Sequence, residues 1–434
     1  MKRVAFYTLG CKVNQYDTEA MMEQFRLAGY ELVDFSDIAD VYIINTCTVT
    51  NLGDRKSRQM VRRAHRLNAG AIIGVVGCYA QRAAEEVLAI PGVRFVMGTK
   101  NRNRIVEIVE KAEEEGIVIN AVEDILTSRD FEELTIDAPE GHTRAFLKIQ
   151  EGCEQFCSYC IIPYVRGPIR SRKRQDILKE VKRLEAAGFK EIVLTGIHLA
   201  SYGRDSGEGS LAEIIADIHS IDGIERIRLG SVEPTLLTPS FVERMASLKK
   251  VCPHYHVSLQ SGSDHILRRM NRKYTTEEYR QFIRNLRSYI PDAAVTTDVM
   301  VGFPGEEEEH FQETFDFVQE IAFSKIHVFQ YSPRKGTLAA KMKNQVSTVD
   351  KETRSKRLIK LADELGKAYV ASFLGTAQKV LFEEEVPWEK GWLQGFTDHY
   401  IKVMAEGDQN LKGSIAYVLL KEQDEELVRG SIVP

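Results

Sequence analysis

Three cysteines stand close together in the 434-residue chain, at Cys153, Cys157 and Cys160. Their spacing is Cys-x3-Cys-x2-Cys, and thiolates are the usual protein ligands of iron–sulfur clusters. Three thiolates on one short loop can bind three irons of a 4Fe-4S cluster and leave the fourth iron open to a small molecule, as in a reactive metal centre. Zinc fits less well because it usually takes four ligands, and no fourth cysteine or suitable histidine lies nearby.

Three further cysteines are far apart in the sequence, yet each follows the same kind of segment. Cys11 follows VAFYTLG, Cys47 follows VYIINT and Cys78 follows AIIGVVG, and all three segments read as buried strands. The carboxyl ends of parallel strands share one edge of a sheet, so the three thiols can meet there. We interpret them as the ligands of a second three-cysteine cluster, with three inert core thiols as the alternative. The seventh cysteine, Cys252, has no partner pattern and is interpreted as a plain thiol.

The elements around these cysteines predict an α/β protein. Residues 1–118 alternate strand patterns (the three above and RFVMG) with helix patterns over residues 16–28 and 54–67. Such alternation predicts a Rossmann-like parallel sheet with helices on its faces. This amino-terminal domain would hold the auxiliary cluster, and a more polar, irregular linker is predicted over residues 119–138.

The alternation resumes over residues 139–372, the predicted central domain. Six strand candidates follow one another: AFLKIQ, EIVLTG, IERIRLG, HYHVSLQ, AVTTDVMVG and KIHVFQYS. They predict a partial (β/α)6 barrel, and such barrels work at the carboxyl ends of their strands, where the Cys153 loop stands. A charged helix is predicted over residues 349–372. Short strands in residues 373–434 (AQKVLFEE, GWLQGF, YIKVMA, GSIAYVLL) predict a small all-β barrel.

The composition is that of an ordinary globular protein, with 43% hydrophobic and 28% charged residues. No apolar run approaches the roughly 20 residues of a membrane helix, and the start has no small-residue cleavage site, so we expect a cytoplasmic protein without a membrane partner. A net charge of −5 argues against non-specific coating of nucleic acid but allows local basic patches. Clustered cysteines in a long cytoplasmic chain favour a metal over disulfides.

The triplet loop resembles that of the radical S-adenosylmethionine (SAM) superfamily. Two three-cysteine sets in this order resemble the methylthiotransferase family over the whole chain. The segments TLGCKVNQYDTEAM and EGCEQFCSYCIIPYVRGPIRSR look most like its MtaB branch, which acts on threonylcarbamoyladenosine in tRNA. At the first of these places MiaB-like members tend to read GCQMN, and RimO-like members GCPKN.

This resemblance implies two 4Fe-4S clusters, each with three cysteine ligands, and SAM on the open iron of the central cluster. SAM cleavage there would give a radical that removes hydrogen from the substrate, while the other cluster provides sulfur and a second SAM the methyl group. The implied product carries a methylthio group on carbon-2 of N(6)-threonylcarbamoyladenosine at tRNA position 37, next to the anticodon. An external electron donor such as flavodoxin or ferredoxin and an RNA-binding, TRAM-like terminal barrel are also implied.

SAM has an adenine, a ribose and charged groups, so a barrel must offer it polar contacts at strand ends. The resemblance places Tyr159, before the third cysteine, near the adenine. Gly302 and Gly305 would permit close approach of the backbone to the cofactor. His198 and His256 are interpreted as structural. The candidates for SAM contact, each of which is otherwise an ordinary loop or capping residue, are Thr195, Gly196, Ser231, Glu233, Gln260, Asp298 and Gly302.

Two basic stretches adjoin the cysteines, and each is either a phosphate-binding surface or a solvated helix face. One follows the triplet (Arg166, Arg170, Arg172, Lys173, Arg174), and the other follows Cys47 (Arg55, Lys56, Arg58, Arg62, Arg63, Arg66). The aromatic and basic residues of the terminal barrel either meet single-stranded RNA or fill the barrel core: Phe382, Trp388, Trp392, Phe396, His399, Tyr400 and Lys402.

Other functions stay open at this point. Within the family, these are a MiaB-type enzyme acting on isopentenyladenosine in tRNA and a RimO-type enzyme acting on an aspartate of a ribosomal protein. Outside it, these are an iron–sulfur carrier without SAM chemistry and a non-catalytic RNA-binding protein. Formation of 5′-deoxyadenosine by the reduced protein with SAM separates the radical enzyme from the carrier.

Overall fold

The computed structural model describes residues 1–134, 136 and 143–433. Its amino-terminal part is built on one parallel sheet with the order β2-β1-β3-β4-β5-β6. The strands are β1 (Arg3–Thr8), β2 (Glu31–Val33), β3 (Val41–Thr46), β4 (Ile72–Gly77), β5 (Val93–Met97) and β6 (Ile119–Ala121). The sequence predicted four of them. It missed the edge strands β2 and β6, since three residues are too few to show a strand pattern.

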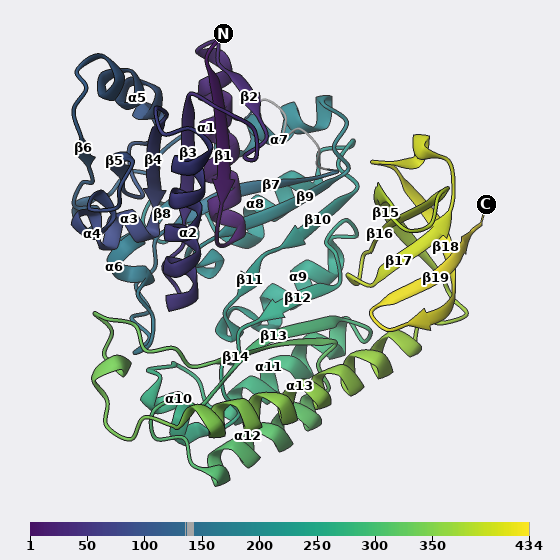
Figure 1. The fold of residues 1–434 in the computed structure, drawn as a ribbon. Helices are drawn as coiled ribbons and strands as arrows, with labels where there is room; N and C mark the ends of the chain where they lie inside the picture. The colour runs from purple at the N-terminus through teal and green to yellow at the C-terminus, as the bar shows by residue number, and fades with distance from the viewer. Residues whose placement is uncertain (135, 137–142, 434) are drawn as a thin grey trace.

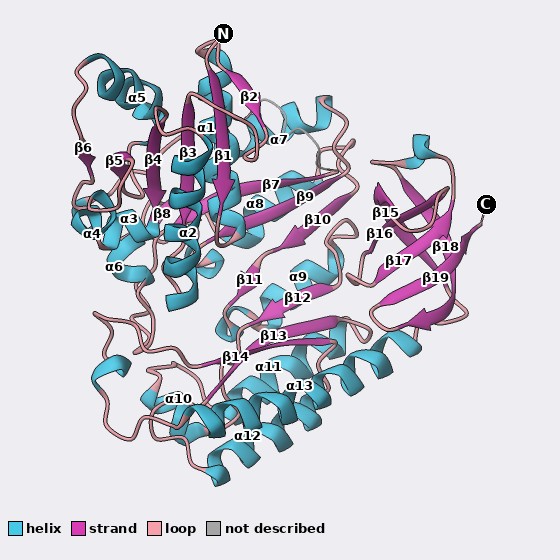
Figure 2. Ribbon diagram, viewed as in Figure 1, coloured by secondary structure: helices cyan, strands magenta, loops and turns pink. Residues whose placement is uncertain are grey.

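Two hydrophobic cores lie on opposite faces of this sheet, and Figure 2 shows the helices that cover them. One face packs against α2 (Asn51–Leu67), α3 (Cys78–Arg82) and α4 (Ala84–Leu88); the other packs against α1 (Lys12–Leu27) and α5 (Ile105–Glu114). Helix α1 begins at Lys12, not at the predicted residue 16. Cys11 is therefore the residue that caps this helix.

The central part is an open half-barrel of two four-stranded sheets, in teal and green in Figure 1. The orders are β10-β9-β7-β8 and β11-β12-β13-β14, and an isolated bridge between Ile227 and Val251 joins the sheets. All six predicted strands are present, and the two-residue strands β8 and β11 are additional. The bounds are β7 (Arg144–Glu151), β8 (Arg170–Ser171), β9 (Glu191–Gly196), β10 (Arg226–Leu229), β11 (Ser231–Val232), β12 (His254–Val257), β13 (Ala294–Val301) and β14 (Lys325–Gln330).

Helices on the outer face of the half-barrel form the largest hydrophobic core. They are α7 (Arg174–Ala186), α8 (Leu211–His219), α9 (Pro239–Ser247), α11 (Thr276–Tyr289), α12 (Glu308–Ile321) and α13 (Thr348–Ala371). The shorter helices α6 (Ile162–Arg166) and α10 (Asp264–Arg269) adjoin the triplet loop. Along β7, Leu147 and Ile149 belong to this core, so strand alternation turns Phe146 and Lys148 toward the inner face. On the other strands the residues that alternate with this core are mostly polar, as with Thr195, Arg228, His256 and Asp298, so the inner face is largely polar.

The carboxyl-terminal part is a closed five-stranded barrel with the order β15-β16-β17-β19-β18. Its strands are β15 (Ala377–Glu385), β16 (Trp392–Thr397), β17 (Lys402–Glu406), β18 (Ile415–Asp424) and β19 (Leu427–Ile432). The α/β fold with a terminal all-β barrel is confirmed, and only β19 was not predicted. Helix α13 runs along the half-barrel to this barrel (Figure 1), close to its predicted bounds.

The domain boundaries after residues 118, 138 and 372 stay predictions. The first residues of the predicted linker form β6, and residues 135 and 137–142 lie outside the described part of the chain. Among the described residues, no helix is long and apolar enough to cross a membrane.

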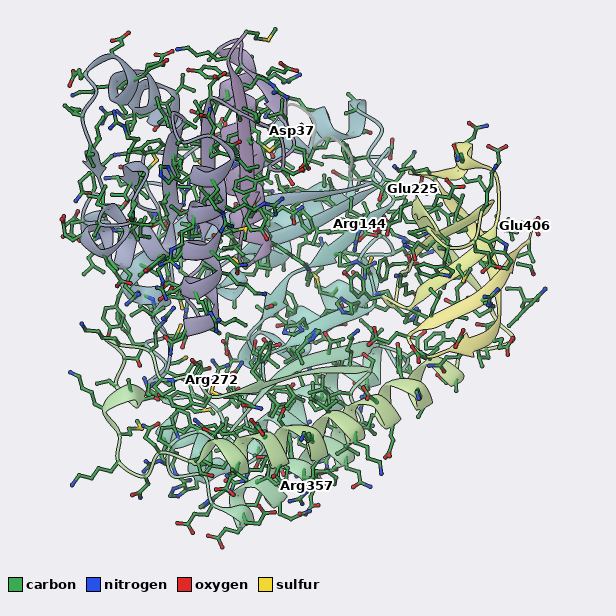
Figure 3. The ribbon with its side chains drawn as sticks, in the orientation of Figure 1. Asp37, Arg144, Glu225, Arg272, Arg357 and Glu406 are labelled. Atoms are coloured by element: carbon green, nitrogen blue, oxygen red, sulfur yellow. The ribbon has the colours of Figure 1, made fainter. Side chains whose placement is uncertain are left out.

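Aromatic residues of the terminal barrel join it to the half-barrel. Tyr400 stacks on His254 with ring centroids 4.9 Å apart, and the guanidinium of Arg228 lies 4.8 Å from its ring centre. Arg144, labelled in Figure 3 between the two barrels, donates a hydrogen bond to the Tyr400 hydroxyl at 3.2 Å. Phe382 fills the barrel core. Tyr400 and Phe382 were both considered for RNA contact. In the structure Tyr400 contributes to docking of the two barrels, and Phe382 packs inside the terminal barrel.

A buried group of charges joins the amino-terminal sheet to the half-barrel. Asp17 on α1 accepts hydrogen bonds from Lys148 on β7 and from Arg166, and pairs with Arg102 at 3.1 Å. Burial alone would raise the pKa of Asp17, but attraction by Arg102, Lys148 and Arg166 outweighs burial and holds the pKa below the usual aspartate value. Each charge is thus compensated inside the protein.

The basic stretch after the triplet belongs largely to this interior, and the expectation of a phosphate-binding or solvated surface was wrong for most of it. Arg166, Arg170 and Arg172 are only 1–3% exposed. Arg172 pairs with Glu133 and with Glu180. Arginines cluster here because a buried carboxylate needs a buried partner, and sequence alone does not distinguish this role from phosphate binding.

We predict that Asp17→Asn destabilises the protein by about 3–5 kcal/mol, because it leaves three buried cations without their shared carboxylate. Thermal unfolding of the anaerobic protein measures the change. Glu107→Gln is the matched control, since Glu107 pairs with Arg104 on the surface, and it should leave the melting temperature unchanged. Equal melting temperatures for Asp17→Asn and the control would contradict a stabilising role of this network.

Candidate functional site

The three spread cysteines lie at one edge of the amino-terminal sheet. Cys11 caps α1 after β1, Cys47 follows β3, and Cys78 begins α3 directly after β4. Gly10 has a φ of +118°, and a Cβ built on it would lie 2.9 Å from the Cys47 Cβ. Glycine is therefore needed here for the Cys11 loop to pack against Cys47. The predicted convergence of the strand ends is present.

The electrostatics of this triad suit a metal cluster. Burial, together with the neighbouring sulfurs of Cys78 and Cys11, raises the pKa of the Cys47 thiol to about 12. Arg166 donates a hydrogen bond from Nε to the Cys78 sulfur at 3.2 Å. Three neighbouring thiolates are costly without a cation, and metal binding supplies that charge and releases the protons. The donor set fits a three-cysteine iron–sulfur cluster.

The central triplet lies on the loop after β7. The Cys153 amide donates to the carbonyl of Gly167 at 3.1 Å, and the Cys160 amide donates to the Cys157 carbonyl at 2.9 Å, which fixes the loop. Burial raises the pKa of Cys153 to about 11 and that of Cys160 to about 12. As at the other triad, the thiolates require added positive charge.

Both triads offer sulfur as their donor atom. Within the part of the chain that the structure describes, no three His, Cys, Asp or Glu side chains come close enough to chelate one metal ion. The sulfur-only donors of both triads are those that iron–sulfur clusters use.

Arg272 connects the central triplet to one predicted SAM residue. Its Nη1 donates to the Cys157 sulfur at 3.4 Å, and its Nη2 donates to Glu233 at 2.7 Å. The carboxylate of Glu233 thereby lies beside the cysteine loop, where it could meet a cationic group of SAM. The sequence analysis missed Arg272, because these partners lie 115 and 39 positions away.

Gln150 is a second residue that sequence reasoning missed. Its Nε2 donates to the carbonyls of Glu151 and Gly152 at 2.7 and 2.8 Å, and its Oε1 accepts from the His198 amide at 2.7 Å. It therefore ties the start of the triplet loop to the loop after β9. Gln150 is a polar residue near the end of a predicted strand, and this pattern in the sequence could have identified it.

The remaining predicted SAM residues are spread along the carboxyl ends of the half-barrel strands. Thr195 and Gly196 end β9, and exposed Ser231 begins β11. Gln260 has a φ of +70° and donates its amide to the Asp298 carbonyl at 2.9 Å. Each lies on or beside the polar inner face, and their contact with SAM stays a prediction.

Tyr159 and Gly302 have clear structural partners. The Tyr159 ring meets Phe303 edge-on, with centroids 6.4 Å apart. Gly302 has a φ of +72°, and a Cβ there would lie 2.2 Å from the Lys351 side chain, while its amide donates to Glu306 at 2.8 Å. The need for glycine at 302 thus comes from Lys351, and contact of the Gly302 backbone with SAM stays a prediction.

Arg334 holds the loop that carries Cys47. This arginine follows β14 of the half-barrel and is 3% exposed. It donates to the carbonyls of Thr48 and Thr50 at 2.5 and 2.8 Å, and to both carboxylate oxygens of Asp54 at 2.8 and 2.9 Å. One side chain of the half-barrel therefore fixes the backbone beside an auxiliary cysteine.

The family comparisons agree with this geometry. Residues 147–318 match the radical SAM superfamily, and residues 3–98 match the uncharacterized protein family UPF0004. The solved structure of TsrM from Kitasatospora setae, a radical S-adenosylmethionine methyltransferase with cobalamin and a [4Fe-4S] cluster bound, aligns with a TM-score of 0.57 at 14% identity, over 78% of this chain and 74% of that chain. The fold and the triplet loop define a radical SAM protein, which implies a 4Fe-4S cluster and SAM.

Curated relatives define the family within this class. The chain is 46% identical over 421 residues to the threonylcarbamoyladenosine tRNA methylthiotransferase MtaB of Bacillus subtilis, covering 96% of this chain and 93% of that protein. It is 38% identical to the tRNA-2-methylthio-N(6)-dimethylallyladenosine synthase of Pelotomaculum thermopropionicum, covering 96% and 95%. The chain belongs to the radical SAM methylthiotransferase family and is an enzyme of that kind.

We predict that Arg334→Gln lowers methylthiolation about 10–100-fold, the usual effect of losing a residue that orients a metal ligand. The same variant should bind less iron at the auxiliary triad yet still cleave SAM at the central one. Product formation, iron content and 5′-deoxyadenosine measure the three effects.

Arg357→Gln is the matched control, because Arg357 lies on the outer helix α13 (Figure 3) and pairs with Glu308 on the surface. It should leave all three readouts unchanged. A normal auxiliary iron content and a normal product rate in Arg334→Gln would contradict the positioning role.

Proposed function

We propose that this enzyme adds a methylthio group to carbon-2 of N(6)-threonylcarbamoyladenosine at position 37 of tRNA. The observation that carries the proposal is the pairing of two three-cysteine sites, one on the amino-terminal sheet and one on the half-barrel, joined through Arg166. Similarity to MtaB of Bacillus subtilis at 46% and of Aquifex aeolicus at 39% identity supports this nucleoside over the dimethylallyl one.

In this proposal each cysteine set binds one 4Fe-4S cluster. When bound, the central cluster with SAM supplies a carbon-centred radical, the auxiliary cluster supplies sulfur, and a second SAM supplies the methyl group. Cys153, Cys157 and Cys160 bind the first cluster, and Cys11, Cys47 and Cys78 bind the second. An external one-electron donor such as flavodoxin or ferredoxin is needed, and we place the reaction in the cytoplasm.

The chain's own residues orient and shield these groups. Arg272 and Arg166 each place a guanidinium against one sulfur of a triad, which stabilises a negatively charged ligand set. Glu233 and the strand-end residues Thr195, Gly196, Ser231, Gln260 and Asp298 would surround SAM. The amino-terminal sheet lies over one side of the half-barrel, where it would limit the access of water to the bound groups.

Two surfaces are suited to bind RNA. Helix α2, which follows Cys47, has exposed Arg55, Lys56, Arg62, Arg63 and Arg66, a row of cations for phosphates near the auxiliary site. On the terminal barrel Trp388 is 65% and Tyr417 48% exposed, and Lys379 lies 5.9 Å from the Tyr417 ring centre. Exposed aromatic rings with nearby cations can stack on unpaired bases. An anticodon stem–loop presents both features.

The test is a reaction with defined RNA. Anaerobically reconstituted enzyme, SAM and a reductant are incubated with an anticodon stem–loop that carries threonylcarbamoyladenosine, and the nucleosides are analysed by mass spectrometry. We expect the 2-methylthio nucleoside and 5′-deoxyadenosine. Methylthio product only from isopentenyladenosine RNA, or only from a ribosomal protein aspartate, would contradict the proposed substrate. No 5′-deoxyadenosine at all would favour an electron carrier.

We predict that the two cysteine sites have separable roles. Cys157→Ala should reduce SAM cleavage to background, because the cluster that binds SAM loses a ligand. Cys47→Ala should still cleave SAM but make no methylthio product, because only the sulfur source is lost. Cys252→Ala is the control, since Cys252 is a buried core thiol outside both triads, and its activity should be retained. Methylthio product from Cys47→Ala would show that the assigned sulfur source is wrong.

A further inference from the structure

Lys12 lies where the amino-terminal sheet meets the polar inner face of the half-barrel. It directly follows Cys11 and is exposed. Its ammonium lies 5.9 Å from the ring centre of Phe146, which strand alternation places on the inner face of β7. The charged groups that act on it come from the half-barrel strands (Arg144 and Glu191, which begin β7 and β9, and Arg228 in β10) and from Tyr400 of the terminal barrel. All three parts of the chain therefore meet around this ammonium.

The neighbouring cations are neutralised by carboxylates, and Lys12 is not. Arg144 pairs with Glu383 at 2.7 Å, and Arg228 pairs with Glu191 at 2.7 Å. Among the residues that the structure describes, no ion pair or hydrogen bond is formed by the Lys12 ammonium. Lys148 differs from Lys12 in this respect. It is buried and pairs with Asp17, which lies on α1 as Lys12 does.

The position of Lys12 is also unfavourable for folding. It is the first residue of α1, and the amino-terminal end of a helix carries partial positive charge, so a cation there is repelled. A lysine at this place gains nothing from the helix, and within the described part of the chain its ammonium contacts an aromatic ring and no anion. An anionic ligand on the inner face would remove both deficits.

We propose that Lys12 binds the carboxylate of the threonylcarbamoyl group and so selects this nucleoside over a dimethylallyl one. The inference rests on the proposed function. Both nucleosides present the same adenine, but only the threonylcarbamoyl arm carries a negative charge. Carbon-2 and carbon-6 flank the same ring nitrogen of adenine, and carbon-6 carries the exocyclic nitrogen that bears the arm. A base whose carbon-2 faces the auxiliary triad therefore extends its arm over the residues beside Cys11.

The energetic reason for a lysine is desolvation. A carboxylate that leaves water for a protein site needs a paired cation. A site built to pair with a charged substrate group discriminates strongly against a substrate that lacks this group, because the site's own charge is then left unpaired. The apolar dimethylallyl arm gains nothing from Lys12, and burying the ammonium against it would be unfavourable. One residue can thus determine which arm is accepted.

The experiment compares substrate and protein changes in one cycle. The full reconstituted chain, as wild type, Lys12→Gln and Lys12→Arg, is given three stem–loop RNAs that carry the threonylcarbamoyl group, its methyl ester, or a dimethylallyl group. Lys367→Gln, which alters an exposed lysine on α13, is the matched control. The readouts are KM, kcat, iron content and 5′-deoxyadenosine.

For the free acid we expect Lys12→Gln to lower kcat/KM about tenfold or more, mainly through KM, as for the loss of a charged hydrogen bond. Wild type should show a similar loss with the ester, and Lys12→Gln should lose nothing further on it. Lys12→Arg should recover most of the activity because it keeps the charge. Iron content and uncoupled SAM cleavage should match wild type, as should every readout of Lys367→Gln.

Two results would overturn the proposal. An unchanged kcat/KM of Lys12→Gln on the free acid shows that the ammonium does not bind the arm. An equal loss on acid, ester and dimethylallyl RNA shows contact with a phosphate, or a structural effect on the Cys11 loop, that does not depend on the carboxylate. Failure of the proposed function is distinguishable, since wild type itself would then make no product from threonylcarbamoyl RNA.

Discussion

The guanidinium of Arg166 is fully buried and lies between the two cysteine sites. It contacts the Cys78 sulfur on one side and Glu151, two residues before Cys153, on the other, and it also donates to Asn14 and Asp17 on α1. The amino-terminal sheet and the half-barrel have no shared strand, so their relative placement depends on such contacts. A planar group with five donors can satisfy several acceptors at once, which a lysine in this place could not do.

Positive charge is used in three different ways around the site. Arg166 and Arg272 each contact one cysteine sulfur, where they compensate anionic ligands. Arg334 instead holds the backbone after Cys47. Lys12 has no anionic partner within the described residues and faces the inner surface of the half-barrel. The three buried arginines therefore support cluster ligands or a loop, whereas exposed Lys12 is the residue that we propose for substrate contact.

Much of the fold and the cysteine sites could be predicted from the sequence because they depend on local patterns. Strand alternation and the residues after each strand located Cys11, Cys47 and Cys78 at one sheet edge. The edge strands β2 and β6 were missed because they are too short to show a pattern. Arg272 and Arg334 were missed because their partners are distant in sequence. Arg172 shows the converse: a basic stretch looked exposed, but its carboxylate partners, Glu133 and Glu180, could be recognised only in three dimensions.

The account depends on each triad binding its own four-iron cluster. Anaerobic reconstitution, followed by iron and sulfide analysis of the wild type and of a variant with Cys11, Cys47 and Cys78 all changed to Ala, tests this directly. We predict about eight irons per chain for the wild type and about four for the variant, with the spectrum of the central cluster retained. A wild type that saturates near four irons, or a variant that binds as many as the wild type, would contradict the account.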